Sequence, residues 1–355
     1  IVSSSRRDAY QTIAAEVQAR IAQLSGVHLP IVDAEHVSTQ HVLSRQNAIV
    51  LGNLVSSKFV ERLYWQWYTL LDLWYPGPGG YLVRSLHDPY GTGHNVIFLG
   101  GSDDEGVAQA ARVFCDHLQP AEPLWVGYLA HIQLGRGHEM PPNGEWVDPR
   151  LRLLAAHLRT PSGYSEASRA GLIYFYNGDT QYAKRFRDLA LQTEILYGTD
   201  HYKAHMHAII WDLIEESPFF SLEERYQITE RLLRHARGRD GSAGIERLLH
   251  CTAKGLHDRH LAMQANCTLT DSRYFGKYWP SDEWKRNLDA VRAYFDRQMT
   301  MCKGDSDLGG RGIYSYLESA LIPALLLGDE RLITSGALEH YAELCLMHCD
   351  NTGYM

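Results

Sequence analysis

The sequence predicts a two-part chain, a small α/β layer sandwich followed by an incomplete (α/α) toroid of helical hairpins. Its 355 residues are too many for one average domain. Strand-like and helix-like patterns alternate in the first third, whereas only helical patterns follow residue 149. Five of the 13 prolines lie within 120–149, as is typical of a linker. We therefore expect an α/β domain over 1–122, a linker over 123–148 and a toroid domain over 149–355.

The expected elements of the α/β domain follow from apolar spacing and from the residues that bound each run. Residues 5–24 repeat apolar side chains every three or four positions, as an amphipathic helix does. Residues 58–74 form an aromatic-rich helical stretch, and a helix that reaches about residue 117 opens with Ser102 as its N-cap. Short apolar runs bounded by Gly, Asn or Asp indicate strands. These runs are 31–32, 48–51 and 96–99.

The toroid domain is predicted from consecutive helical periods joined by short turns. At two joints, Gly178-Asp179 and Gly328-Asp329, a C-cap glycine directly precedes an N-cap aspartate, which is typical of a tight helical hairpin. Paired helices without a strict repeat favour an incomplete toroid over a regular solenoid. The expected helices span 151–158, 163–176, 182–196, 202–215, 222–237, 256–275, 283–301, 313–327 and 332–347.

Composition excludes several classes of protein. The 34 Lys and Arg against 42 Asp and Glu give a net charge of −8, which disfavours broad nucleic-acid binding. No apolar run approaches the roughly 20 residues that cross a bilayer. The six cysteines contain no CxxC pair, so we expect mostly small buried side chains. Without an apolar run of membrane length, we expect a soluble chain. Because it starts at Ile1 with neither Met nor a charged-then-apolar leader, we expect a processed or shortened chain without a signal peptide, which leaves export open.

A glycine-rich turn in the first domain invites comparison with phosphate-binding loops. Residues 95–107 read as a strand, two glycines and a helix start, but they contain neither GxGxxG nor GxxxxGKS/T. The sequence therefore does not favour nucleotide binding. Residues 47–52 and 93–107 instead resemble the non-catalytic α/β domain that precedes the catalytic domain in several polysaccharide-degrading enzymes. The resemblance covers the first domain and implies no active site there.

Histidines of the helical region form the first two polar clusters. His201 and His205 share a helical face at i,i+4, as zinc ligands can, and His207 follows, but there is no HExxH arrangement. A metal site, substrate binding and ordinary core packing all stay open for this cluster. Arg259, His260 and Gln264 lie near the start of a predicted helix, where they either face a cleft or form a solvated first turn.

The third cluster is a glycine-rich polar loop that leads into an apolar helix. Residues 304–318 deliver Arg311, Tyr314, Tyr316 and Glu318 to that helix start. Because Tyr and Arg are costly to bury without partners, the loop is either a hydrogen-bonded lock or a working site.

Three stretches, 211–220, 260–269 and 304–329, resemble the toroidal domain of heparinase- and alginate-lyase-type polysaccharide lyases. Members of that family have an Asn-His pair at the start of the middle helix and a catalytic Tyr in a loop fifty-odd residues later. Here 54 residues separate His260 from Tyr314. Two departures are clear: Asp258-Arg259-His260 stands where the family has Asn-Asn-His, and no segment here fits the β-sandwich that commonly follows the toroid.

The resemblance implies β-elimination from an anionic, uronic-acid-containing polysaccharide. A cation or amide neutralises the substrate carboxylate, while a tyrosine removes the C5 proton and protonates the leaving C4 oxygen. The implied catalytic residues are Tyr314, His260, Arg259 and Arg311, with Tyr316 second to Tyr314 and His205 able to share the base role with His260. The implied substrate-binding residues are His205, His207, Trp211, Gln264, Tyr316 and Glu318.

The same resemblance sets the expected partners and location. We expect a polysaccharide substrate, no nucleic acid, a secreted or periplasmic protein, and no cofactor, with a divalent metal left open. Trp211, Tyr174 and Trp279 are candidate stacking platforms for sugar rings, although the sequence favours a place in the core for each of them.

Two alternatives remain from the residues themselves. Asp305, Asp307 and Glu318 near the loop offer carboxylates for a glycoside hydrolase on the same toroid. A non-catalytic carbohydrate-binding fragment is the other alternative. Elimination leaves an unsaturated uronide that absorbs in the ultraviolet, whereas hydrolysis does not.

Overall fold

The computed structural model describes residues 1–2, 7–34, 46–121, 123–138, 163–193, 195, 204–238, 241–251, 259–299 and 320–347. The chain forms two compact units. The first contains Ile1–Arg159, Glu166–Gln192 and Ile210–Tyr226, and the second contains Thr160–Ser165, Thr193–Ile209 and Gln227–Met355.

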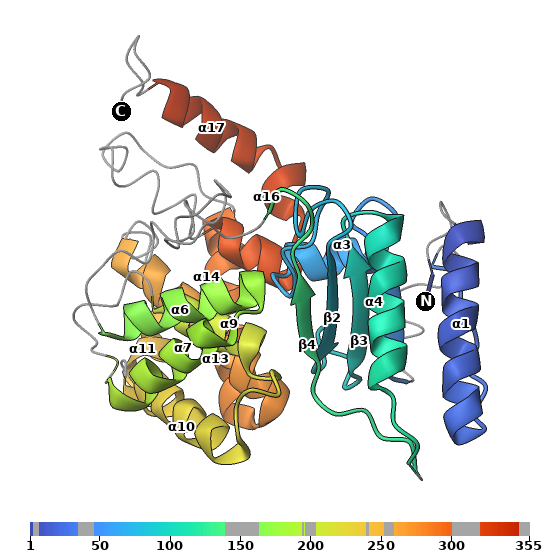
Figure 1. Cartoon of the computed structure of the whole chain (residues 1–355). Helices are drawn as coiled ribbons and strands as arrows, with labels where there is room; N and C mark the ends of the chain where they lie inside the picture. Colours follow the sequence, from blue (N-terminus) through green and yellow to red (C-terminus); the bar gives the residue numbers. More distant parts are fainter. Residues whose placement is uncertain are drawn as a thin grey trace. The chain divides into compact units, whose positions relative to one another are not determined.

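The first unit is built around a mixed four-stranded sheet of order β1-β3-β2-β4 (Figure 1). Its strands are β1 (Ala48–Gly52), β2 (Tyr81–Leu86), β3 (Val96–Gly101) and β4 (Ala130–Gln133). β1 and β3 are parallel, with Ala48 opposite Val96, whereas β2 is antiparallel to both β3 and β4. The strands predicted at 48–51 and 96–99 are therefore β1 and β3.

Two strands were missed and one was predicted wrongly. Residues 31–32 form no strand, and the nearby chain makes only an isolated parallel bridge between Val2 and Asp33. β4 lies within the stretch expected to be a linker, 123–148. β2 was missed because Arg84 interrupts its apolar pattern, yet this side chain is buried.

Arg84 is buried because residues far away in the sequence supply its contacts. Its Nη2 donates to the Leu213 carbonyl, and its guanidinium lies 4.5 Å above the centre of the Phe175 ring. Burial lowers the pKa of this guanidinium, while Tyr75 and Glu216 are among the neighbours that oppose the shift. The residue therefore joins β2 to helices of the same unit.

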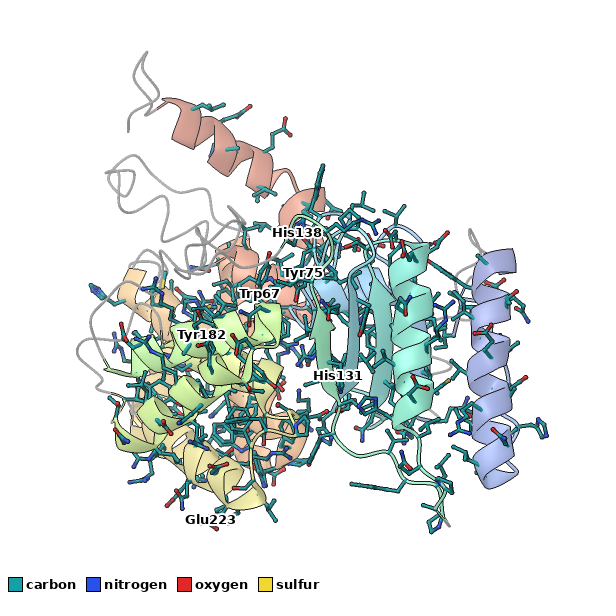
Figure 2. All side chains as sticks on the ribbon, in the orientation of Figure 1. Trp67, Tyr75, His131, His138, Tyr182 and Glu223 are labelled. Carbon is teal, nitrogen blue, oxygen red and sulfur yellow. The ribbon has the colours of Figure 1, made fainter. Side chains whose placement is uncertain are left out.

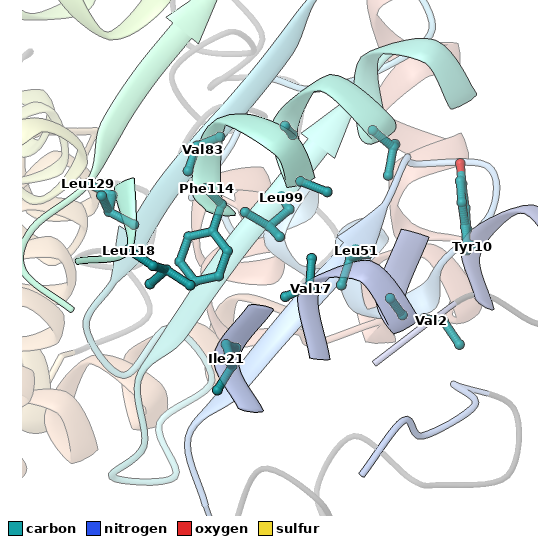
Figure 3. Close-up of a cluster of buried hydrophobic side chains, with 14 residues drawn as sticks. Val2, Tyr10, Val17, Ile21, Leu51, Val83, Leu99, Phe114, Leu118 and Leu129 are labelled. Atoms are coloured by element: carbon teal, nitrogen blue, oxygen red, sulfur yellow. The ribbon is translucent and has the colours of Figure 1, made fainter. Parts of the chain in front are cut away.

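Helices α1 (Arg7–Ser25) and α4 (Asp104–His117) form a hydrophobic core together with the sheet. α4 packs on β2 and β3, and α1 packs on α4 and β1. Figure 3 shows Phe114 of α4 beside Val83 and Leu99 of the strands, with Val17 of α1 near them. Burial of each such side chain stabilises the fold by roughly 1.5–3 kcal/mol.

The connection from β3 to α4 depends on three glycines in direct backbone contact. A side chain at Gly106 would clash with the Gly80 carbonyl, and one at Gly101 would clash with the backbone of Gly106. The first turn of α4 therefore rests on strand backbone. Its N-cap is Asp103 rather than the predicted Ser102, because Asp103 Oδ1 accepts from Gly106 N at 2.8 Å.

The helix predicted over 58–74 is shorter than expected. α3 spans Lys58–Trp65, and Trp67 then adopts φ = 61°. Tyr68 N donates to Leu63 O at 2.8 Å, and Trp67 N donates to Tyr64 O at 3.1 Å, which is the hydrogen-bond pattern of a Schellman C-cap. The sequence did not indicate that the helix ends here, because a tryptophan occupies the position directly after the C-cap that is usually a glycine.

Helices α6 (Gly163–Asn177) and α7 (Thr180–Gln192) meet at the first predicted hairpin joint. Gly178 has φ = 71° and donates to Tyr174 O at 2.8 Å, and Asp179 Oδ1 accepts from Gln181 N at 2.9 Å. The glycine C-cap and aspartate cap are thus confirmed. At the second joint the glycine is confirmed, with Gly328 at φ = 65°, but the aspartate cap is wrong. The N-cap of α16 (Arg331–Thr334) is Glu330, and Asp329, one residue earlier, accepts from Arg331 N through Oδ1.

The second unit is helical throughout its described residues. α13 packs along α14, and α11 packs against both. The guanidinium of Arg297 in α14 donates hydrogen bonds to the carbonyls of Leu248 and Leu249. These hydrogen bonds cap the C-terminal end of α11. The elements beyond α7 are α9 (His205–Ile214), α10 (Leu222–Gly238), α11 (Gly241–Leu249), α13 (Arg259–Tyr278), α14 (Asp282–Met299), a helix at 320–327, α16 (Arg331–Thr334) and α17 (Ala337–Met347).

The overall class agrees with the sequence in outline. A mixed sheet with helices precedes a mostly helical region, and closure of these helices into a toroid stays a prediction. The helix expected over 332–347 is broken at Gly336, where φ = 78°. Among the described residues, no helix is both long and apolar enough to cross a bilayer.

Candidate functional site

The N-terminal turn of α13 is the part of the predicted site that the structure describes best. His260 is exposed in this turn, whereas Leu261, Ala262 and Met263 directly after it are buried. A helix that is buried on nearly all sides must emerge from the protein interior at such an end. The turn therefore presents the His260 imidazole to solvent.

Gln264 lies one turn below His260 on the same helical face. The two residues are four positions apart, so their side chains are neighbours along the helix surface. Gln264 is half-buried, and its amide can both donate and accept hydrogen bonds. The pair places an imidazole and an amide on one face of the same helix end.

The α9 histidines lie in a buried setting. His205 and His207 are both buried, and the His207 ring meets the Tyr164 ring edge-on with centroids 4.8 Å apart. Tyr164 was overlooked because it reads as an apolar position of the helix predicted over 163–176. This placement supports the core interpretation that the sequence left open for His205 and His207.

Tyr164 carries a phenol in an apolar setting. Burial raises the pKa of Tyr164, and the nearby positive charge of Arg231 opposes this shift. The Tyr164 hydroxyl is buried and has no hydrogen-bond partner among the described residues. Since an unmet buried hydroxyl costs about 1–3 kcal/mol, this group is a weak point of the packing in the second unit.

Asn266, which closes the polar cluster that the sequence shows around His260, lies in the interior. It lies on α13, is fully buried, and neither atom of its amide has a hydrogen-bond partner among the described residues. The sequence did not indicate its burial, because asparagine is seldom found at a buried helical position.

Trp211 has the surroundings of a core residue. Its ring is fully buried, stacks on Phe186 with centroids 5.5 Å apart and meets Phe220 edge-on at 5.3 Å. Of the two other candidate platforms, Tyr174 is buried with its hydroxyl 2.5 Å from Ser217 Oγ, whereas Trp279 is exposed. Trp279 is therefore the candidate platform that a sugar can reach in this structure.

Several predicted site residues lie outside the described residues. These are Arg311, Tyr314, Tyr316 and Glu318 of the loop, the hydrolase candidates Asp305 and Asp307, His201 of the α9 cluster, and the side chain of Arg259. The meeting of His260 with Tyr314 thus stays a prediction. Within the described part of the chain, no group of three or more His, Cys, Asp or Glu side chains is arranged to hold a metal ion.

The backbone amides of the glycine-rich turn in the first unit are already occupied by side chains of the chain itself. Asp103 accepts from Gly106 N and, through Oδ2, from Gly79 N at 3.0 Å, while Ser102 Oγ accepts from Gly77 N at 3.0 Å. The first turn of α4 already faces a carboxylate of its own chain. A phosphate would meet that negative charge, which agrees with the sequence argument against nucleotide binding.

Comparisons with protein-family models, with curated proteins and with solved structures find no match to this chain.

Proposed function

We propose that this protein is a polysaccharide lyase that cleaves an anionic, uronic-acid-containing polymer by β-elimination. The observation that carries the proposal is the exposed start of α13, where His260 and Gln264 share one face at the end of a buried helix. In the sequence this turn precedes Tyr314 by the interval that the lyase family shows.

The chemistry needs a neutralised carboxylate first. The C5 proton of a uronate is not acidic while the neighbouring carboxylate keeps its full charge. The Gln264 amide donates a hydrogen bond to that carboxylate, and Arg259 and Arg311 supply positive charge. Groups fixed in advance in this way stabilise the enolate-like anion that develops as the proton leaves.

In the elimination itself, Tyr314 takes one proton from the substrate and then returns it. Tyr314, as the phenolate, takes the proton from C5, and the electrons of the C5–H bond form the C4–C5 double bond. The C4–O bond breaks, and the departing oxygen takes the proton back from Tyr314. The adjacent cations favour the phenolate, since a free tyrosine has a pKa near 10. His260 shares the base role, because histidine titrates near neutral pH.

The test is a panel of polymers followed by three variants. Sodium alginate, polygalacturonate, heparin and hyaluronan are incubated with the full chain, and ultraviolet absorbance of the unsaturated product is recorded. We expect His260→Ala and Tyr314→Phe to lower kcat/KM by roughly 10²–10⁴-fold. The matched control is His250→Ala, because His250 is another exposed histidine, directly after the end of α11, and its kcat/KM should stay within about twofold of the wild type.

The outcomes separate the alternatives. New reducing ends without ultraviolet absorbance would identify a hydrolase, and binding without cleavage would identify a non-catalytic fragment. Full activity of Tyr314→Phe would remove Tyr314 from the mechanism.

A further inference from the structure

The turn Asp72–Tyr75 of the first unit contains an exposed tryptophan. Trp74, between α3 and β2, is 72% exposed, and its neighbour Leu73 is 54% exposed. Tryptophan is usually well buried, because its ring carries a large apolar area. An indole at this exposure on an ordered turn therefore calls for an explanation.

The backbone on both sides of Trp74 is firmly held. Asp72 Oδ1 accepts from Trp74 N at 2.7 Å and from Tyr75 N at 2.8 Å, and Asp72 N donates to Tyr75 O at 2.9 Å. Tyr75 is buried, stacks on Tyr176 with centroids 4.7 Å apart, and donates from its hydroxyl to Tyr176 O at 2.6 Å. Little backbone entropy remains to be lost when Trp74 binds a ligand.

A positively charged residue, Arg136, lies on a second segment that is hydrogen-bonded to the residues directly after this turn. Gly135 N donates to Pro76 O at 2.7 Å, and Arg136 N donates to Pro78 O at 3.1 Å. In Figure 2, Tyr75 and His138 lie near the same end of the sheet. The side chain of Arg136 is 73% exposed and is 3.7 Å from Glu105, a contact between two exposed groups. Since such surface pairs are weak, a ligand carboxylate can compete for Arg136.

We infer that the turn Asp72–Tyr75 is a carbohydrate platform on the first unit. The Trp74 indole stacks on the apolar C–H face of a pyranose ring, and Arg136 pairs with a carboxylate of the same anionic polymer. This inference rests on the proposed function for the class of polymer, but it concerns binding and not cleavage.

The size of the exposed area decides between a sugar and a protein. A stable protein interface buries about 800 Å² on each partner. Trp74 and Leu73 together offer far less than this, because even a fully buried aromatic side chain contributes only about 150–250 Å². One indole does match the face of one pyranose ring.

The experiment is affinity electrophoresis of the full chain through gels that contain alginate, polygalacturonate or neutral dextran. We expect Trp74→Ala to weaken retardation by alginate or polygalacturonate about tenfold, and Trp74→Tyr to restore most of it. Arg136→Gln should weaken binding to the anionic polymers. The matched control is Trp125→Ala, because Trp125 is 77% exposed but lies outside the turn, and it should bind as the wild type does.

Each result bears on the inference separately from the lyase proposal. If a polymer is cut but Trp74→Ala binds it normally, the platform is wrong and the lyase proposal stands. If no polymer is cut but Trp74-dependent binding remains, the lyase proposal fails and the platform stands. Equal losses in Trp74→Ala and Trp125→Ala, or no retardation of the wild type by any anionic polymer, would overturn the platform.

Discussion

The starts of α4 and α13 differ in what they leave available to a ligand. At α4, Asp103 accepts hydrogen bonds from Gly106 and Gly79, and the helix rests on strand backbone at Gly80. At α13, the first turn carries exposed His260, with Gln264 on the same face. Both helix ends attract negative charge, but the first is occupied by the chain itself.

This difference teaches that a glycine-rich strand-to-helix turn is not by itself a binding site. The glycines before α4 allow close packing of backbone on backbone, and the cap carboxylate completes the junction. The start of α13 carries the chemically useful side chains instead. The two helix starts should therefore respond differently to substitution.

Among the variants that compare the two helix starts, the largest effect is expected at Gln264. Gln264→Glu places a second negative charge beside the substrate carboxylate, so kcat/KM on the cleaved polymer should fall by roughly 10²–10³-fold. Asp103→Asn at the closed helix start should leave kcat/KM unchanged. Equal loss in both variants would mean that the two helix starts do not differ in function.

Gly106 should matter for stability more than for activity. A side chain in Gly106→Val meets the Gly80 carbonyl, so the first unit should lose about 1–3 kcal/mol or more of stability. Hydrogen exchange of peptides from β3 and α4 measures this loss. The control is Gly276→Ala in α13, where a side chain finds ordinary contact with Trp284 and should be neutral or stabilising.

The identity of the α4 cap gives a smaller effect. Asp103→Ala should destabilise the first unit by about 0.5–2 kcal/mol, because it removes the acceptor for Gly106 N. Asp104→Ala removes a negative charge from the first turn, an effect of about 0.3–1 kcal/mol. Exchange protection of α4 amides ranks the two variants, and the reverse order would contradict the assigned cap.

The smallest effect is a pH dependence in the first unit. Burial and the neighbouring His117 ring, 4.3 Å away between centroids, lower the pKa of His131. As pH falls through the ordinary histidine value of about 6.5, the unfolded chain takes up the proton first, so stability falls. Above that pH both states are neutral at His131 and its contribution is constant.

His131→Gln tests this dependence. The variant should lose less exchange protection than the wild type between pH 7.5 and pH 5.5 in peptides from β4. The exposed His28 serves as the control, and His28→Gln should behave as the wild type does. An unchanged pH response in His131→Gln would show that other groups set the acid sensitivity.

Local signals in the sequence predicted the helices and their joints well. Gly178-Asp179 ends one helix and caps the next because glycine reaches positive φ and aspartate accepts from early helix amides. The stop of α3 at Trp65 escaped prediction because Trp67 adopts that backbone conformation without being glycine. Tyr68 and Leu71, which follow this residue, are buried, and the sequence of the segment does not show what buries them.

The sequence by itself determined the change from a sheet with helices to a mostly helical region, the strands β1 and β3, and the position of His260 at a helix start, because each follows from periodicity and capping within a few residues. Only the tertiary structure decided that β2 accepts a buried Arg84, that Trp211 belongs to the core, and that Trp74 is left exposed. The physical reason is that burial of a side chain depends on the partners that other segments bring. For Arg84 those partners are the Leu213 carbonyl and the Phe175 ring, both more than eighty residues away in the sequence.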